Sequence, residues 1–177
     1  MRVLAISGSL RARSTNTSLL QALTLLSPPQ LEIVIYEDLD QIPPFNPDLE
    51  AEGNSGPVAR FRTALRDCGA VLISTPEYAH GIPGTLKNAL DWIVGSGELS
   101  GKPVALVNAS SRGKYAQASL KEILSTMDAR LLQDADVTVN ILGKDLTPPQ
   151  IAETPEFASA LKASLHAVVN LCGTVKA

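Results

Sequence analysis

Short runs of apolar residues recur along the chain, and most of them are continuous instead of alternating with polar positions. The five runs are Val3–Ile6, Leu31–Tyr36, Ala70–Ser74, Val104–Val107 and Ala135–Ile141. Continuous runs of Val, Ile and Leu are typical of strands that are covered on both faces, as in a parallel sheet. The pattern therefore predicts five buried parallel strands.

The segments between these runs carry apolar residues at three- and four-residue spacing, which predicts helices. These helical segments are Leu19–Leu26, Val58–Leu65, Leu86–Ile93, Ala116–Met127 and Pro155–Leu171. Five strands alternating with helices predict an α/β fold: a flavodoxin-like, doubly wound parallel sheet with strand order 2-1-3-4-5 and helices on both faces. We find no repeat or linker and expect one domain over residues 1–177, in which the Pro-rich stretch 42–47 is a surface loop.

Composition narrows the class of protein further. Of the 177 residues, 45% are hydrophobic and 19% are charged, with a net charge of -3, which gives no electrostatic footprint for nucleic acid. No apolar run approaches the roughly 18 residues of a membrane span. The first apolar run stops at Ser7-Gly8-Ser9, too early for a signal peptide, so we expect a cytoplasmic protein. Cys68 and Cys172 lie far apart without a His cluster, which argues against a metal site.

The loop after the first predicted strand, residues 8–18, is rich in hydroxyl and basic side chains and leads into a helix. A helix N-terminus attracts anions, and hydroxyls together with a fork-shaped guanidinium suit a terminal phosphate monoester. The candidate phosphate ligands in this loop are Ser9, Arg11, Ser14, Asn16 and Thr17. The alternative is that these residues merely cap the helix and that the arginines are solvated.

Two competing phosphate motifs do not match. In the first loop Leu10 and Arg13 stand where the dinucleotide-binding pattern G-x-G-x-x-G requires glycine. Gly101-Lys102 resembles the end of a Walker A motif, but Pro103 replaces its Ser or Thr and a strand follows it.

The loop after the third predicted strand combines prolines and glycines in the run T-P-E-Y-A-H-G-I-P-G, residues 75–84. These residues fix an unusual backbone path and allow a planar ligand to approach closely. Backbone amides held in such a loop are suited to hydrogen bonding with the polar edge of an isoalloxazine ring.

The two loops together resemble the signature of the NADPH-dependent FMN reductase family, which includes quinone, azo-dye and chromate reductases. The first loop reads G-S-L-R-x-x-S-x-N, and the resemblance extends over essentially the whole chain. It implies FMN as cofactor, with its phosphate held by Ser9, Arg11, Ser14 and Asn16, and its isoalloxazine ring lying along Pro76, Glu77, Tyr78 and Gly81.

One departure from the family concerns Ala79 and His80, where many members carry Asn-Gly or a similar pair. A contact made by that Asn side chain cannot be transferred to this chain. We include Ala79 and His80 among the candidate cofactor contacts, and the imidazole either shapes the acceptor pocket or is simply an exposed loop residue.

The loop after the fourth predicted strand, residues 108–115, supplies the remaining candidates. Ser110, Ser111 and Gly113 fit contacts to the ribityl chain or the ring edge of the flavin. Arg112 and Lys114 suit the phosphates of an incoming NAD(P)H, or form an ordinary exposed basic loop.

These observations predict an FMN-dependent oxidoreductase that accepts a hydride from NADPH or NADH. By ping-pong kinetics it would then reduce a small acceptor: a quinone, free flavin, an azo compound or a metal oxyanion. The cofactor carries the chemistry, so we assign no catalytic side chain. The main alternative is a flavodoxin-type electron carrier, which the aromatic content of 4% and the small net charge disfavour. A flavin-free domain would leave both loops without a role.

The helix from Pro83 to Val94 is also a candidate interface. Leu86, Ala89, Leu90 and Ile93 account for its core face, so we expect Trp92 to lie outside the core. We expect Trp92 to anchor the interface of a homodimer, or of a homotetramer built from two such dimers. The resemblance adds weight, since members of the family commonly dimerise through this region. The alternative is that Trp92 covers the edge of its own sheet.

Overall fold

The computed structural model describes residues 1–51 and 56–173, and its centre is a parallel sheet in the order β2-β1-β3-β4-β5. The strands are β1 (Arg2–Ser7), β2 (Glu32–Tyr36), β3 (Ala70–Ser74), β4 (Pro103–Asn108), β5 (Arg130–Leu131) and β6 (Val137–Thr138). This confirms the flavodoxin-like order 2-1-3-4-5 predicted from the sequence. The runs of β1, β3 and β4 are continuous and apolar because these strands are buried at the centre of the sheet.

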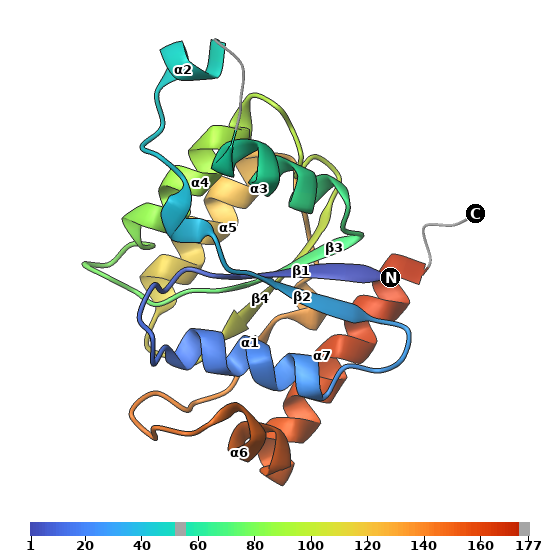
Figure 1. Ribbon diagram of the computed structural model, residues 1–177. Helices are drawn as coiled ribbons and strands as arrows, with labels where there is room; N and C mark the ends of the chain where they lie inside the picture. The colour runs from blue at the N-terminus through green and yellow to red at the C-terminus, as the bar shows by residue number, and fades with distance from the viewer. Residues whose placement is uncertain (52–55, 174–177) are drawn as a thin grey trace.

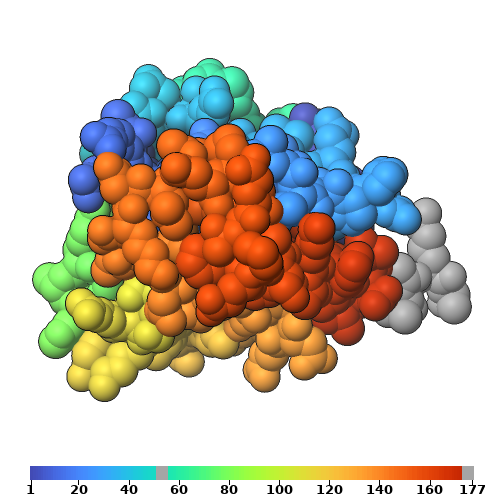
Figure 2. Space-filling view, turned by 90° about the horizontal axis from the view of Figure 1, so that it is seen from below, coloured from blue at the N-terminus to red at the C-terminus, as the bar shows by residue number. Residues whose placement is uncertain are grey.

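Helices cover both faces of the sheet (Figure 1). On one side lie α1 (Thr15–Leu25), α6 (Pro148–Glu153) and α7 (Pro155–Gly173), and on the other α3 (Pro57–Arg66), α4 (Gly84–Val94) and α5 (Lys114–Thr126). The shorter elements are α2 (Pro47–Ala51) and the 3₁₀ turns η1 (Leu39–Gln41) and η2 (Gln133–Ala135). Figure 2 shows the chain from about residue 140 onward spread across the first of these faces, beside α1. Each face buries its own apolar cluster.

The predicted fifth strand over residues 135–141 is wrong in its bounds. The position is shared by two short pieces, β5 and β6, which pair with successive parts of β4 and are separated by η2 and Asp136. In the gap, the Asp136 carboxylate accepts a hydrogen bond of 2.8 Å from the backbone N–H of Leu106. It also lies 2.7 Å from the ammonium group of Lys121. A side chain thus replaces the strand carbonyl that would otherwise satisfy this part of β4.

We therefore expect Asp136→Ala to lower the free energy of unfolding by about 2 kcal/mol, because it removes a charge-assisted acceptor from a buried N–H. Asp136→Asn keeps a neutral acceptor and should lose clearly less. Urea denaturation of both variants measures the difference. If the two variants lose the same stability, the ion pair with Lys121 and not the bond to Leu106 is responsible.

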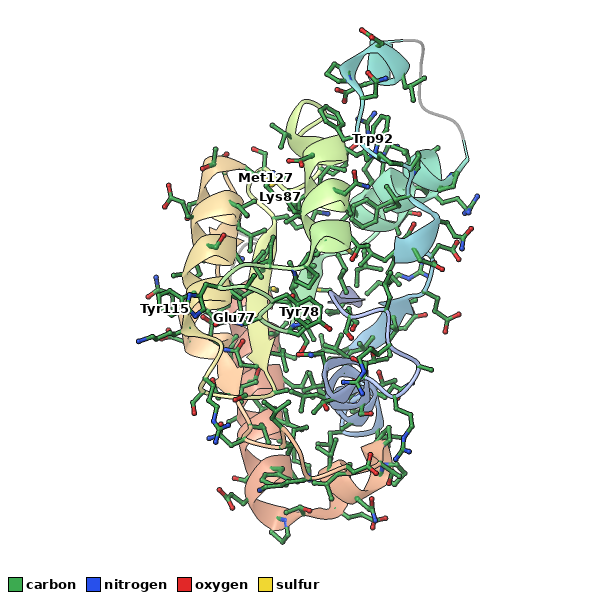
Figure 3. The ribbon with its side chains drawn as sticks, turned by 90° about the vertical axis from the view of Figure 1, so that its left-hand side faces the viewer. Glu77, Tyr78, Lys87, Trp92, Tyr115 and Met127 are labelled. Atoms are coloured by element: carbon green, nitrogen blue, oxygen red, sulfur yellow. The ribbon has the colours of Figure 1, made fainter. Side chains whose placement is uncertain are left out.

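Trp92 is a second correction. Its side chain is only 2% exposed and its indole N–H donates to the carbonyl of Pro43 at 2.7 Å. The Phe45 ring meets it edge-on, with centroids 5.2 Å apart, and Asn88 of the same helix donates to the Pro43 carbonyl as well. The segment before α2 therefore covers this side of α4, so the expectation that Trp92 lies outside the core is wrong (Figure 3).

Both cysteines are free thiols away from one another in the fold. Cys68 follows α3 and is buried, and Cys172 is half-buried near the end of α7. Burial raises the pKa of both thiols above the ordinary value. Among the described residues there is no group of three or more His, Cys, Asp or Glu side chains suited to a metal ion. Within the same residues, no helix combines the length and the apolar character needed to cross a membrane.

Candidate functional site

A cleft of about 300 Å³ opens at the carboxyl ends of β1, β3 and β4. This is the switch point of the strand order, where ligands bind in sheets of this type. Its lining comes from Ser9, Arg11, Ser14, Thr15, Asn16, Thr75, Pro76, Glu77, Tyr78, Asn108, Ala109, Ser110, Arg112, Gly113, Gln117 and Leu142. A larger hollow of about 1090 Å³ follows the free edge of β2 between α1 and α3 and contains none of the predicted site residues. Position in the fold and the polar lining both favour the smaller cleft.

The first loop presents one end of this cleft. Ser14 is the N-cap of α1, and its hydroxyl accepts a hydrogen bond from the N–H of Thr17. The buried Asn16 accepts from the Ser74 hydroxyl at 3.0 Å, which ties α1 to β3 and leaves its amide NH₂ group available to an anion in the cleft. Arg11 lines the cleft and forms no ion pair within the described residues. This end of the site is therefore built from donors and one uncompensated cation.

Two residues of the same loop point elsewhere. Arg13 is ion-paired with Asp145 at the surface. Thr17 lies behind the loop, with its hydroxyl oxygen 2.8 Å from that of Ser7, and does not line the cleft. Of the predicted phosphate ligands, Ser9, Arg11, Ser14 and Asn16 share the cleft and Thr17 supports them from outside.

Gly8 holds the first loop against the second. Its N–H donates to the carbonyl of Ser74 at 2.8 Å, and a Cβ atom at this position would lie 2.4 Å from the Thr75 hydroxyl oxygen. That Cβ atom would also lie 2.9 Å from the Thr75 Cβ, so Thr75 would have to shift, and glycine at this position allows the two loops to meet.

The tip of the second loop is a tight hairpin. Tyr78 and Gly81 exchange backbone hydrogen bonds of 3.0 and 2.9 Å, and the two residues between them have positive φ, 49° at Ala79 and 60° at His80. Positive φ at both central positions is the type I′ arrangement, which favours Asn-Gly. This explains the pair found in the resembling family. Here Ala79 and His80 occupy the exposed tip, and neither they nor Gly81 line the cleft.

The second and third loops are joined by two contacts. The Glu77 carboxylate accepts from the backbone N–H groups of Tyr115 and Ala116, at 2.8 and 2.9 Å, and so completes the N-terminal turn of α5. The His80 imidazole stacks on the Tyr115 ring with centroids 4.3 Å apart. Figure 3 shows Glu77 and Tyr115 side by side, with Tyr78 nearby. Glu77 therefore lines the cleft, and the hydrogen bonds that its carboxylate accepts hold the N-terminus of α5 in position.

The third loop brings Ser110 and Gly113 to the cleft, whereas Ser111 faces Asn140 and donates its N–H to that side chain. Sequence reasoning did not single out Asn108 and Gln117. Both line the cleft, and both carry a buried side-chain oxygen that has no hydrogen-bond partner within residues 1–51 and 56–173, Oδ1 of Asn108 and Oε1 of Gln117. The position of Asn108 at the end of β4 was a signal in the sequence, whereas Gln117 lies within α5 and reaches the cleft only through the fold.

Unsatisfied buried acceptors are rare, and two in one cleft call for a ligand with hydroxyl or N–H donors. FMN has such donors in its ribityl chain and ring N–H, and a phosphate for the first loop. The lining residues therefore fit FMN at both ends of the cleft.

Comparison with known proteins gives the same result. The model of the NADPH-dependent FMN reductase family matches residues 1–142. The chain is 39% identical over 146 residues to an NAD(P)H-dependent FMN reductase of Pseudomonas aeruginosa, covering 79% of this chain and 78% of that protein. It is 42% identical over 139 residues to a quinone reductase of Pseudomonas putida, covering 74% and 73%.

Among solved structures, the flavoenzyme NAD(P)H:(acceptor) oxidoreductase FerB from Paracoccus denitrificans superposes with a TM-score of 0.83 at 26% identity. The superposition covers 98% of this chain and 97% of that one. The family model, the sequence identities and the superposed fold lead to one conclusion: the chain belongs to the NADPH-dependent FMN reductase family, and its activity is that of an NAD(P)H-dependent reductase that uses FMN.

Proposed function

We propose that this protein binds one FMN in the cleft at the ends of β1, β3 and β4, and that quinones are the acceptors it reduces. The observation that carries the proposal is the cleft itself, whose lining combines an uncompensated cation and hydroxyls at the start of α1 with Asn108 and Gln117, whose buried side-chain oxygens have no hydrogen-bond partner among the described residues. The relative of Pseudomonas putida, named a quinone reductase, supports the choice of acceptor.

In this arrangement each group of residues has a separate task. Ser9, Arg11, Ser14 and Asn16 hold the phosphate, and the amide oxygens of Asn108 and Gln117 accept from hydroxyl or N–H donors. When bound, FMN accepts a hydride from the nicotinamide and delivers electrons to the acceptor. Tyr78 is 52% exposed and leaves the mouth of the cleft open, so that nicotinamide and acceptor occupy the same place in turn. Glu77 keeps the second loop and α5 in register.

We also propose a domain organisation, a location and an oligomeric state for this protein. Residues 1–177 form one cytoplasmic domain, and the protein is a homodimer or homotetramer. Of the chain, residues 52–55 and 174–177 lie outside the described part. Exposed apolar side chains beside α4, namely Phe45, Leu49 and Val94, offer an interface that does not depend on Trp92.

The test is a visible spectrum of the purified protein, followed by anaerobic reduction and steady-state kinetics. We expect one FMN per chain, bleaching by a nicotinamide, and parallel double-reciprocal lines when NAD(P)H and a benzoquinone are varied together. Intersecting lines would indicate a ternary complex and contradict the shared position. A bound flavin that neither nicotinamide reduces would instead favour the flavodoxin-type carrier.

A further inference from the structure

The turn at the tip of the second loop is strained. Ala79 and His80 have positive φ, 49° and 60°, and neither is a glycine. In this region Cβ crowds a backbone oxygen, so two such residues in succession cost free energy that the pair Asn-Gly would largely avoid. Strain of this kind persists only where the surrounding structure holds the backbone in place. Contacts made by the turn must therefore offset its cost.

The contact that is particular to His80 is its stack on Tyr115. The ring centroids are 4.3 Å apart and the ring planes meet at 27°, which is close to parallel stacking. Tyr115 lies in the first turn of α5, so the stack joins the tip of the second loop to the helix that follows the third loop. Both residues are exposed, and neither lines the cleft. The imidazole can therefore act on a ligand in the cleft only through the position of the loop that carries it.

The stack is the second of two attachments between the second loop and α5. Glu77 makes the first, since its carboxylate accepts from the N–H groups of Tyr115 and Ala116 at 2.8 and 2.9 Å. The loops are also in close contact here, because a Cβ atom on Gly113 would lie 3.6 Å from the Glu77 Cβ. Tyr78, which lines the cleft, lies in the sequence between the two attachments (Figure 3). The loop is thus fixed to α5 on both sides of Tyr78.

We infer that His80 is a positioning residue: by stacking on Tyr115, it holds the second loop in the conformation that receives the isoalloxazine ring of FMN. The inference rests on the proposed function. A loop that already has its bound conformation incurs no ordering cost when the ligand arrives, whereas a loop that has it part of the time binds in proportion to that fraction. Because FMN and riboflavin share the isoalloxazine ring, the stack contributes equally to the binding of both. The phosphate ligands of the first loop act on FMN alone.

The experiment measures the affinity of the full chain, freed of its flavin, for FMN and for riboflavin. His80→Asn removes the ring, and asparagine tolerates positive φ, so the turn is kept. We expect both affinities to fall by the same factor, about threefold to tenfold, as the loss of one stacked pair implies. The matched control is His166→Asn, the same substitution at the other histidine of the chain, which is exposed on α7. It should change neither affinity.

Variants of the stacking partner test the same contact from the other side. Tyr115→Leu removes the second ring but keeps the backbone N–H that donates to Glu77, and we expect it to lose as much affinity as His80→Asn. The double variant should lose no more than either single variant, because the two rings act as a pair. Tyr115→Phe keeps a stacking ring and should retain the wild-type affinities. All affinities are compared where circular dichroism shows every variant to be folded, so that a loss reports on the loop and not on unfolding.

Three results would overturn the inference and leave the proposed function intact. They are unchanged affinities in His80→Asn, a loss confined to FMN, which would assign the effect to the phosphate end, and additive losses in the double variant, which would show that the two rings act independently. A wild type that binds neither flavin contradicts the proposed function, and the inference with it.

Discussion

Replacing Ser9 and Arg11 together by alanine should weaken the binding of FMN by about 100-fold or more, while the binding of riboflavin changes little. Each side chain offers a hydrogen bond to a phosphate dianion, and bonds to charged groups contribute about 1.5–3 kcal/mol each. Riboflavin shares the ring and the ribityl chain but lacks the phosphate. Quenching of flavin fluorescence during titration of the apoprotein measures both dissociation constants.

Arg13→Ala is the matched control for this experiment. It removes the same charge from the same loop, but its guanidinium is paired with Asp145 and does not line the cleft. We expect it to reduce FMN affinity only slightly. If Arg13→Ala weakens the binding of FMN as much as the double replacement of Ser9 and Arg11 does, the loop acts through its overall charge and not through a built phosphate site. Equal losses for FMN and riboflavin would show that the phosphate lies elsewhere.

Trp92→Ala should destabilise the protein by about 3–5 kcal/mol, as expected for a large aromatic side chain removed from a packed interior. The substitution removes the contact with the Phe45 ring and leaves the Pro43 carbonyl with one donor fewer. Trp92→Phe keeps most of the volume and should cost much less. Chemical denaturation gives the free energy of unfolding for each variant.

Light scattering on the same Trp92 variants separates packing from assembly. Because the side chain is buried within its own chain, the folded variant should keep the oligomeric state of the wild type. A variant of near wild-type stability that dissociates would return Trp92 to the interface. A wild type that is a monomer at micromolar concentration would contradict the proposed homo-oligomer itself.

The central part of the fold was predictable because its strands are buried on both faces. The runs in β1, β3 and β4 are continuous and apolar, and no polar position interrupts them. The last position of the sheet was not predictable in the same way. Asp136 interrupts that edge, and its role depends on the N–H of Leu106, thirty residues earlier, which no local pattern reveals. The prediction that Trp92 lies outside the core was wrong for a related reason, since a Pro-rich segment far away in the sequence covers this side chain.

The site residues also divide into those that a continuous stretch of sequence reveals and those that only the fold brings together. The first loop could be identified because its hydroxyls and arginine precede a helix in a continuous run. Gln117 and Leu142 could not, because one lies inside a helix and the other in a loop far along the chain, and only the fold brings both to the cleft. Glu77 was predicted at the flavin ring, but its hydrogen bonds to α5 depend on a partner 38 residues later.

The raised pKa values of Cys68 and Cys172 affect how readily these thiols react with quinones. Quinones are electrophiles that add to thiolates, and a thiolate, not a thiol, is the nucleophile in such additions. Burial keeps both sulfur atoms protonated at neutral pH to a greater degree than a free cysteine, and neither lines the cleft. We therefore expect both thiols to react with quinones more slowly than a fully exposed cysteine would.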